Sequence, residues 1–183
     1  MKNALLFLAE GFEEIEAIGT IDILRRGDIL TTTVSITGRY DVTGAHGISV
    51  RANDLWANTD FSYADALILP GGMVGASNLD ACEPLKELLV AKAKNRKLLA
   101  AICAAPMVLG GLGLLKGHRA TCFPGFEEDL IGAIITDEPV ETDGNIITGK
   151  GPGMVFDFAL AIIAYLETQI RADKVAANLL LTC

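Results

Sequence analysis

Cys103 is the side chain of this sequence that is best placed for nucleophilic chemistry. It follows the apolar run 97–102 and stands directly before Ala104, Ala105 and Pro106. Because proline suits the first turn of a helix, the pattern predicts a strand that ends at Cys103 and a helix that begins at Pro106. A thiol at such a turn would lie at a helix N-terminus, whose partial positive charge favours the thiolate. The alternative is a buried core cysteine.

A glycine-rich turn, Leu69–Gly72, ends a second predicted strand. In open parallel sheets ligands bind beyond the carboxyl ends of the strands, so this turn and Cys103 could share one crevice. The amides of Gly72 and Ala104 could then form an oxyanion hole, with Gly71 lining the site. The alternative is an ordinary glycine-rich turn.

Three carboxylates, Glu13, Glu14 and Glu16, open the first predicted helix, which ends near Arg26. Glu13 and Glu16 share a helical face, whereas Glu14 points elsewhere, and most of the run should simply cap the helix. The helix is apolar nearly all round, so we expect one acid to enter a buried cleft. Burial would raise the pKa of that carboxyl, which could then donate a hydrogen bond to a thiolate. The apolar surface of helix 13–26 also predicts a homodimer buried along it.

The elements that must position these residues alternate between short apolar runs and helical periodicity. This alternation predicts one α/β domain over residues 1–183, with a mostly parallel sheet and helices on both faces. We expect strands at 4–8, 31–36, 66–69, 97–102 and 119–122, a short hairpin or edge strands at 40–51, a hairpin at 140–148, and a loop through Asn78. We expect helices at 13–26, 126–131, 154–166 and 172–181, after Pro106, and after a capping-box-like start at Asp80 and Glu83.

Composition excludes several function classes. The chain has 183 residues, 51% hydrophobic and 21% charged, with a net charge of −8. It contains no membrane-length apolar run, no signal peptide and no basic stripe for nucleic acid, so we expect a cytoplasmic protein with a small-molecule or protein partner. The scattered cysteines predict neither disulfides nor a zinc site, and no metal or organic cofactor is expected. They are Cys82, Cys103, Cys122 and Cys183.

Taken in this order, the motifs resemble the ThiJ/PfpI superfamily, and most closely its subgroup around the Parkinson-associated protein deglycase. The matching stretches are Ala9–Glu16, Leu69–Gly72, Ala100–Pro106 and Gly151–Gly153. The resemblance runs nearly end to end and includes the closing helix. Each motif is weak alone, and their conjunction at these intervals carries the resemblance.

The resemblance implies a flavodoxin-like three-layer sandwich that forms a homodimer. It also implies an oxidation-sensitive nucleophile at Cys103 and a protonated glutamate at Glu16 in contact with it. Members of the subgroup are credited with glyoxalase activity without glutathione, with repair of glycated proteins and nucleotides, and with chaperone or oxidative-stress roles. Older labels call relatives intracellular peptidases or thiamine-biosynthesis proteins.

One position departs from the subgroup, which often places a histidine near the cysteine where this chain has Phe123. Phenylalanine cannot move protons. His118 lies five residues earlier, on the opposite face of a strand, so it is no substitute. His46 falls where relatives often carry an arginine near the mouth of the site, and the alternative is a surface loop histidine. A bacterial branch of the subgroup also lacks the histidine at 123. The role of Cys122 stays open.

Three functions fit these residues. The leading hypothesis is a cofactor-free enzyme that acts on reactive carbonyls or glycated proteins and nucleotides through Cys103, with Glu16 as the proton shuttle. The second is a non-enzymatic redox sensor or holdase chaperone in which Cys103 is oxidised. The third is an intracellular cysteine peptidase or amidase of the superfamily's other branch, which carries a histidine where this chain has Ala104. We also expect Cys103 to be the most acidic and most readily oxidised of the four cysteines. Glu16→Gln should largely keep the fold and change the oxidation state that Cys103 reaches, whereas Glu14→Gln should do little.

Overall fold

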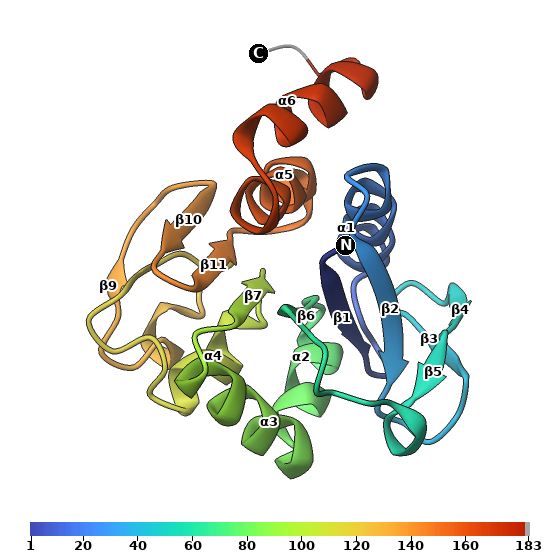
Figure 1. Cartoon of the computed structure of the whole chain (residues 1–183). Coiled ribbons are helices and arrows are strands. Elements are labelled where there is room, and N and C mark those ends of the chain that lie inside the picture. Colours follow the sequence, from blue (N-terminus) through green and yellow to red (C-terminus); the bar gives the residue numbers. More distant parts are fainter. Residues whose placement is uncertain (182–183) are drawn as a thin grey trace.

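The computed structural model describes residues 1–181, which are arranged around a seven-stranded sheet (Figure 1). The strand order is β10-β11-β7-β6-β1-β2-β5, and all neighbours are parallel except β10 and β11. The strands of this sheet are β1 (Asn3–Leu8), β2 (Leu30–Ser35), β5 (Asp54–Leu55), β6 (Ala66–Leu69), β7 (Leu98–Ile102), β10 (Val140–Asp143) and β11 (Ile146–Gly149). Two small sheets pair β3 (Asp41–Thr43) with β4 (Ser49–Arg51), and β8 (Arg119–Ala120) with β9 (Ile134–Ile135).

Helices cover both faces of the sheet. In Figure 1, α1 and α5 lie above it, α2, α3 and α4 lie below it, and α6 extends beyond α5 at the C-terminal end. The helices are α1 (Glu14–Arg26), α2 (Met73–Asp80), α3 (Glu83–Lys94), α4 (Pro106–Gly111), α5 (Val155–Leu166) and α6 (Gln169–Asn178), with short 3-10 turns at Trp56–Asn58, Glu127–Asp129 and Pro152–Met154. This is the flavodoxin-like three-layer sandwich that the sequence predicts.

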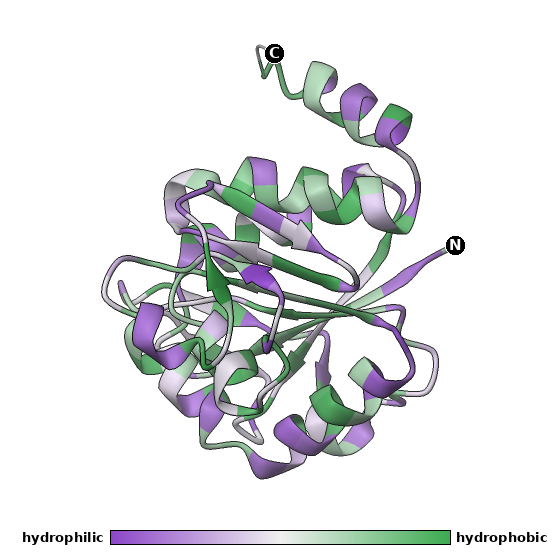
Figure 2. Cartoon of the chain, turned by 90° about the vertical axis from the view of Figure 1, so that its left-hand side faces the viewer, coloured by the Kyte–Doolittle hydropathy of each residue, from purple (hydrophilic) through white to green (hydrophobic). Residues whose placement is uncertain are grey.

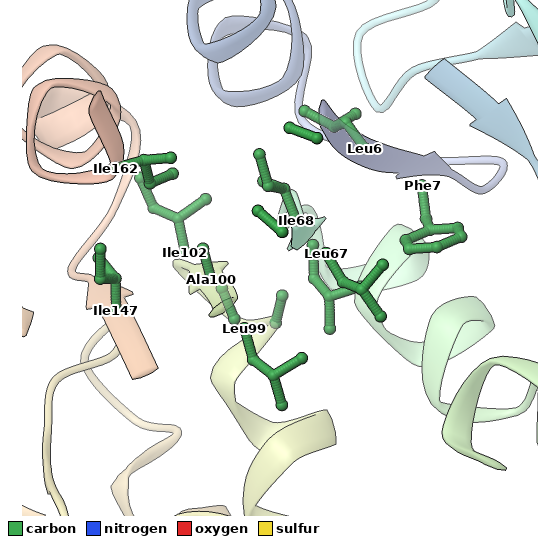
Figure 3. Close-up of a cluster of buried hydrophobic side chains, with 14 of the residues drawn as sticks. Leu6, Phe7, Leu67, Ile68, Leu99, Ala100, Ile102, Ile147 and Ile162 are labelled. Atoms are coloured by element: carbon green, nitrogen blue, oxygen red, sulfur yellow. The ribbon is translucent and has the colours of Figure 1, made fainter. Parts of the chain in front are cut away.

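The central strands are buried on both faces, which explains their continuous apolar sequences. Every residue of β6 and β7 is buried. Figure 3 shows the two faces: Ile102 points toward Ile162 of α5, whereas Phe7, Leu67 and Leu99 point toward the opposite layer. Figure 2 shows mainly hydrophobic central strands enclosed by helices that carry both hydrophobic and hydrophilic residues. Parallel strands in this setting place all their carboxyl ends at one edge, where β1, β6 and β7 deliver the residues of the site.

Two predicted features on the α2/α3 side are wrong. The loop through Asn78 is the helix α2, which begins directly after Gly72 because that glycine adopts a conformation that turns the chain at once into a helix. The capping box of Asp80 and Glu83 does not form, because Asp80 belongs to α2 and the N-cap of α3 is Cys82, without a side-chain cap.

Beyond Gly117, the expected helix 126–131 is a single 3-10 turn. The predicted hairpins at 40–51 and 140–148 are confirmed.

None of the helices within residues 1–181 is long and apolar enough to cross a membrane.

Helix α1 leaves part of its apolar surface uncovered. Its inner face packs against β1, β2 and α5, which covers Ile21 and Leu24. Ile15 and Ile18 remain 57% and 42% exposed, one turn apart on the same outer face. The expectation of a homodimer along this helix therefore rests on a smaller apolar surface than the sequence suggested.

We predict that the protein sediments as a dimer at micromolar concentration and that Ile15→Glu combined with Ile18→Glu halves its mass, because two charges would replace the apolar contact. Analytical ultracentrifugation measures this directly. Ile170→Glu is the matched control, since Ile170 is 80% exposed on α6. A monomeric wild-type protein, or a dimer that survives both α1 substitutions, would contradict the prediction.

Candidate active site

Cys103 lies at the strand-to-helix turn that the sequence predicts. Strand β7 ends at Ile102 and α4 begins at Pro106, and between them Cys103 has a φ of 64°. This left-handed backbone conformation is strained for a residue with a side chain, and costs on the order of 1–3 kcal/mol. Two backbone hydrogen bonds hold it: Cys103 N–H donates to Gly149 O at 2.9 Å, and Phe123 N–H donates to Cys103 O at 2.8 Å. The side chain is almost completely buried, with the residue 9% exposed.

Gly71 allows a thiol and a carboxyl to meet beside the backbone. A Cβ at position 71 would lie 2.7 Å from the Cβ of Cys103 and 2.7 Å from Oε2 of Glu16. Any side chain here would therefore separate the two groups. Gly71 N–H also donates a hydrogen bond of 2.7 Å to Glu16 Oε2. The residue that the sequence suggested only as a lining residue is thus the contact point of the pair.

Two backbone amides face the sulfur, and they are the two that the sequence selected. The N–H groups of Gly72 and Ala104 donate to the Cys103 thiol, and both lower its pKa. Gly72 has a φ of 88°, and a Cβ there would lie 2.4 Å from Gly11 O. Both observations favour glycine at this position, because a side chain would be strained at this φ and would collide with Gly11 O.

Glu16 is the acid that α1 carries into the interior. It is fully buried and lies against the Cys103 thiol. Its Oε1 has no hydrogen-bond partner within the described residues. Burial raises its pKa to about 7, against the lowering effect of the hydrogen bonds from Gly71 and Cys103, and the charge of Glu13 raises it further. The sequence prediction of one buried acid with a raised pKa is borne out at this residue.

The thiol departs from its sequence prediction. Burial raises the pKa of Cys103 to about 12, and the charge of Glu16 and its hydrogen bond add to this. The helix N-terminus does not outweigh these causes, because α4 has only six residues and begins three positions after the cysteine. Burial also raises the pKa of Cys122, to about 11. Cys103 is therefore not the more acidic of these two cysteines while Glu16 is ionised. Protonation of Glu16 removes the repulsion, so the two groups titrate as a pair.

Glu14 is also buried and has a structural role, and the expected small effect of Glu14→Gln on the oxidation of Cys103 stays a prediction. It is 5% exposed and holds the loop between β3 and β4: its Oε1 accepts from His46 N at 2.7 Å and from Ile48 N at 3.3 Å. Burial raises its pKa, but these bonds and the one with the His46 side chain outweigh burial and lower the pKa to about 2. Gly44 permits the contact, since a Cβ there would lie 2.4 Å from Glu14 Oε1. The glycines on both sides of His46 were the sequence signal for this tight loop.

His46 lies on the surface and is paired with the start of α1. Its side chain is 69% exposed, and Nδ1 lies 2.9 Å from Glu14 Oε2 and 3.7 Å from Glu13 Oε2. Hydrogen bonding to Glu14, followed by the charges of Glu13 and Glu14, raises the pKa of the imidazole. The reading as a surface loop histidine is therefore right, and its partners are the carboxylates that precede Glu16.

The other candidate residues lie at several places in the fold. Phe123 is 43% exposed, bonded to Cys103 through its backbone, and 3.2 Å from where a Cβ on Gly151 would lie. His118 pairs with Asp143 at 3.4 Å, away from Cys103, and supplies no proton relay.

Cys122 is buried in a separate cavity of about 320 Å³ with Glu127 and Lys150. Cys82 is half-buried at the N-cap of α3, and Cys183 lies outside the described residues.

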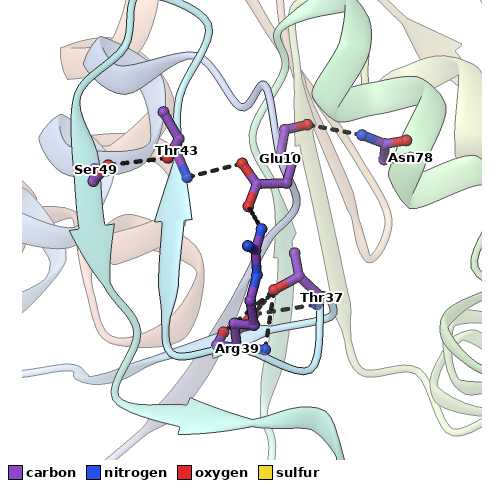
Figure 4. Close-up of polar contacts among 7 residues, drawn as sticks. Glu10, Thr37, Arg39, Thr43, Ser49 and Asn78 are labelled. Carbon is purple, nitrogen blue, oxygen red and sulfur yellow. Dashed lines mark hydrogen bonds and ion pairs between the residues drawn. The ribbon is translucent and has the colours of Figure 1, made fainter.

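A polar clamp that the sequence did not reveal fixes the segment between β1 and α1 (Figure 4). Glu10 pairs with Arg39 at 2.6 Å and accepts a hydrogen bond from Thr43 N at 3.1 Å. Its backbone carbonyl accepts from Asn78 Nδ2 of α2 at 2.8 Å. The clamp joins the β3/β4 hairpin and α2 to the turn that leads to Glu16.

Within residues 1–181, one group of side chains could hold a metal ion by residue type and spacing. It consists of Glu13, Glu14 and His46. We assign no metal ligands there. The imidazole and Glu14 already share a hydrogen bond, and the N-terminus of α1 disfavours a cation.

Comparison with known proteins agrees with this geometry. A model of the DJ-1/PfpI family matches residues 2–165. The chain belongs to the DJ-1/PfpI family. The DJ-1 homologue B of Arabidopsis thaliana is 36% identical over 98% of this chain and 42% of its own length, so the chain spans less than half of that relative. The glutathione-independent glyoxalase of Caenorhabditis elegans is 34% identical over 98% of this chain and 97% of its own length.

Solved structures of DJ-1 proteins share the whole fold. Oxidised DJ-1 of Toxoplasma gondii has a TM-score of 0.96 at 33% identity and covers both chains completely. A Cys-to-Ala variant of a DJ-1 superfamily protein of Salmonella typhimurium has a TM-score of 0.95 at 36% identity, again over both full chains. The DJ-1/PfpI assignment therefore rests on sequence and on three-dimensional structure.

We predict that Glu16→Gln changes how stability depends on pH. The pKa of Glu16 is raised in the fold from 4.5 to about 7, so the folded protein holds this proton more tightly. Wild-type stability should then fall as pH rises from about 4.5 to about 7, by on the order of 3 kcal/mol, and the Gln variant should lack this loss. Urea unfolding at both ends of the window measures it. If the free energy of unfolding depends on pH in the same way in both proteins, Glu16 does not hold a proton with a raised pKa.

We predict the opposite dependence for Glu14→Gln. The pKa of Glu14 is lowered to about 2, so its contribution is present above about 4.5 and is lost as pH falls toward 2. The variant should be less stable than wild type at pH 7 by on the order of 2–3 kcal/mol, with the difference vanishing in acid. Urea unfolding and amide exchange of residues 44–48 report it. Asp22→Asn, on the exposed part of α1, is the control and should change neither.

Proposed function

We propose that the protein is a cysteine-dependent enzyme that needs no cofactor and acts on small reactive carbonyls, in the manner of a glutathione-independent glyoxalase or deglycase. The observation that carries this proposal is the buried contact of the Cys103 thiol with the Glu16 carboxyl at Gly71. The name of the Caenorhabditis elegans relative supports the same class of reaction. Glycated proteins or nucleotides are the larger carbonyl adducts that such a site would serve.

The first step is addition of sulfur to an aldehyde. When the pair carries one proton, that proton can reside on Glu16 and the negative charge on Cys103, where the N–H groups of Gly72 and Ala104 stabilise it. The thiolate attacks the aldehyde carbon of methylglyoxal and forms a carbon–sulfur bond. The carbonyl oxygen becomes an oxyanion next to these amides and takes the proton from Glu16, which gives a hemithioacetal.

Later steps return the thiol. The Glu16 carboxylate removes the proton from the former aldehyde carbon and delivers it to the neighbouring carbon through an enediol, which converts the hemithioacetal into a lactoyl thioester. Water then cleaves the thioester, so that methylglyoxal and water yield lactate and Cys103 regains its proton. No electrons leave the substrate, and no oxidant or cofactor is consumed. The unpartnered Oε1 of Glu16 is free to contact the reacting group.

The second candidate is a redox sensor or holdase in which Cys103 itself is oxidised. The oxidised state of the Toxoplasma gondii DJ-1 structure supports it, and the same Glu16 contact would stabilise a sulfinate by donating a hydrogen bond. Peptidase chemistry has less support, because Ala104 and Phe123 leave no imidazole beside the sulfur to protonate an amine leaving group. The three described cysteines are free thiols, which suits the reducing cytoplasm in which we place the protein as one domain.

We predict that the metal-free protein converts methylglyoxal to lactate and that Cys103→Ser abolishes this activity. Glu16→Gln should lower turnover at least about 100-fold, since general acid–base catalysis contributes about that much. Cys82→Ser and Cys122→Ser are the controls and should keep wild-type rates. Lactate is measured enzymatically, and casein hydrolysis is measured in parallel and should be absent. A sensor would consume peroxide stoichiometrically and form no lactate, and that result would favour the second candidate.

A further inference from the structure

The buried carboxyl of Glu16 has a charged neighbour that the proposed chemistry does not use. The side chain of Glu13 is 13% exposed, and its charge favours the protonated form of Glu16. The same glycine holds both residues: Glu13 N–H donates to Gly71 O at 3.0 Å, and Gly71 N–H donates to Glu16 Oε2 at 2.7 Å. The two carboxyl-bearing residues are therefore both bound to Gly71, Glu13 to its carbonyl oxygen and Glu16 to its N–H.

Glu13 has in turn a counter-charge that can be removed. The Nδ1 of His46 lies 3.7 Å from Glu13 Oε2, and the ring is open to solvent protons. Its loop is fastened to the segment before α1, because Ala45 N–H donates to Phe12 O at 2.8 Å and His46 N–H donates to Glu14 Oε1 at 2.7 Å. The backbone of His46 is therefore held next to the carboxylates whether or not the imidazole is charged.

We propose that Glu13 and His46 form a positioning pair that sets whether Glu16 holds its proton. The Glu13 carboxylate holds the proton on Glu16, and a protonated His46 opposes it. Neither side chain needs to touch the substrate. The inference deepens the proposed function, since it names what controls the proton shuttle.

The charged groups on each side fix the sign of the effect. His46 faces Glu13, the N-cap of α1, and Glu14, its first residue. Glu16 faces Glu13 and, from the end of β7, Cys103. When His46 is protonated, it neutralises much of the field of Glu13, and Glu16 ionises more readily. When His46 loses its proton, that field is unopposed, and Glu16 keeps its proton to higher pH. The two titrations therefore oppose one another, and Glu16 should ionise over a wider pH range than a single independent acid.

The test follows the carboxylic acid C=O band of Glu16 by infrared difference spectroscopy of the full chain from pH 4 to pH 9. Loss of the band in Glu16→Gln assigns it. Glu13→Gln should lower the midpoint by roughly 0.5 on the pH scale or more, because one nearby negative charge is gone. His46→Lys should also lower it and narrow the transition to one proton, whereas His46→Gln should raise it. Asp22→Asn, which removes a charge on the exposed part of α1, should leave it unchanged.

Two outcomes would overturn the inference: a midpoint in Glu13→Gln equal to that of Asp22→Asn, or shifts of the same sign in His46→Lys and His46→Gln, as a purely structural role would give. The readout is a charge state, so it separates this inference from the proposed function. Shifted midpoints without lactate formation would support the role of Glu13 and His46 and contradict the proposed enzymatic function. Lactate formation with unchanged midpoints would support the enzymatic function and contradict the role of Glu13 and His46.

Discussion

Two acidic groups, the Cys103 thiol and the Glu16 carboxyl, share one buried position, and much of the surrounding structure serves that contact. Desolvation raises both pKa values, to about 12 for Cys103 and about 7 for Glu16, and the charge of Glu16 adds to the rise at Cys103, so the two groups cannot both be charged near neutrality. Gly71 is without a side chain because they meet where its Cβ would be. The amides of Gly72 and Ala104 offset part of the cost of a negative charge on sulfur.

The surrounding fold keeps Cys103 and Glu16 in contact although the backbone of Cys103 is strained. Hydrogen bonds to Gly149 of β11 and to Phe123 hold the left-handed backbone of Cys103. The residue is therefore anchored to a sheet whose central strands are buried on both faces. On the other side, the Glu10 clamp and the Glu14 contacts fix the turn before α1. The acid and the thiol therefore arrive from elements that cannot easily move apart, which keeps their proton shared rather than lost to water.

Sequence patterns predicted the strands, the turn at Cys103 and the buried Glu16, because apolar runs, a helix-starting proline and a carboxylate on an apolar helix each have a local cause. The contact at Gly71 and the role of Glu14 depend on residues 32 to 55 positions apart, which no local pattern reports. The helix α2 was missed because Gly71 and Gly72 read as a loop, although Gly72 begins the helix. The thiol pKa was predicted in the wrong direction because desolvation is invisible in sequence.

The most direct test of the shared proton is the thiolate absorbance at 240 nm, followed from pH 5 to pH 12 in a protein whose other cysteines are replaced by serine. We expect two steps for Cys103: a partial rise near pH 7, as the pair loses its first proton, and completion only far above pH 9. In Glu16→Gln the high step should move down and the partial rise should disappear. A single transition near the ordinary pKa of cysteine in both proteins would contradict a proton shared by Cys103 and Glu16.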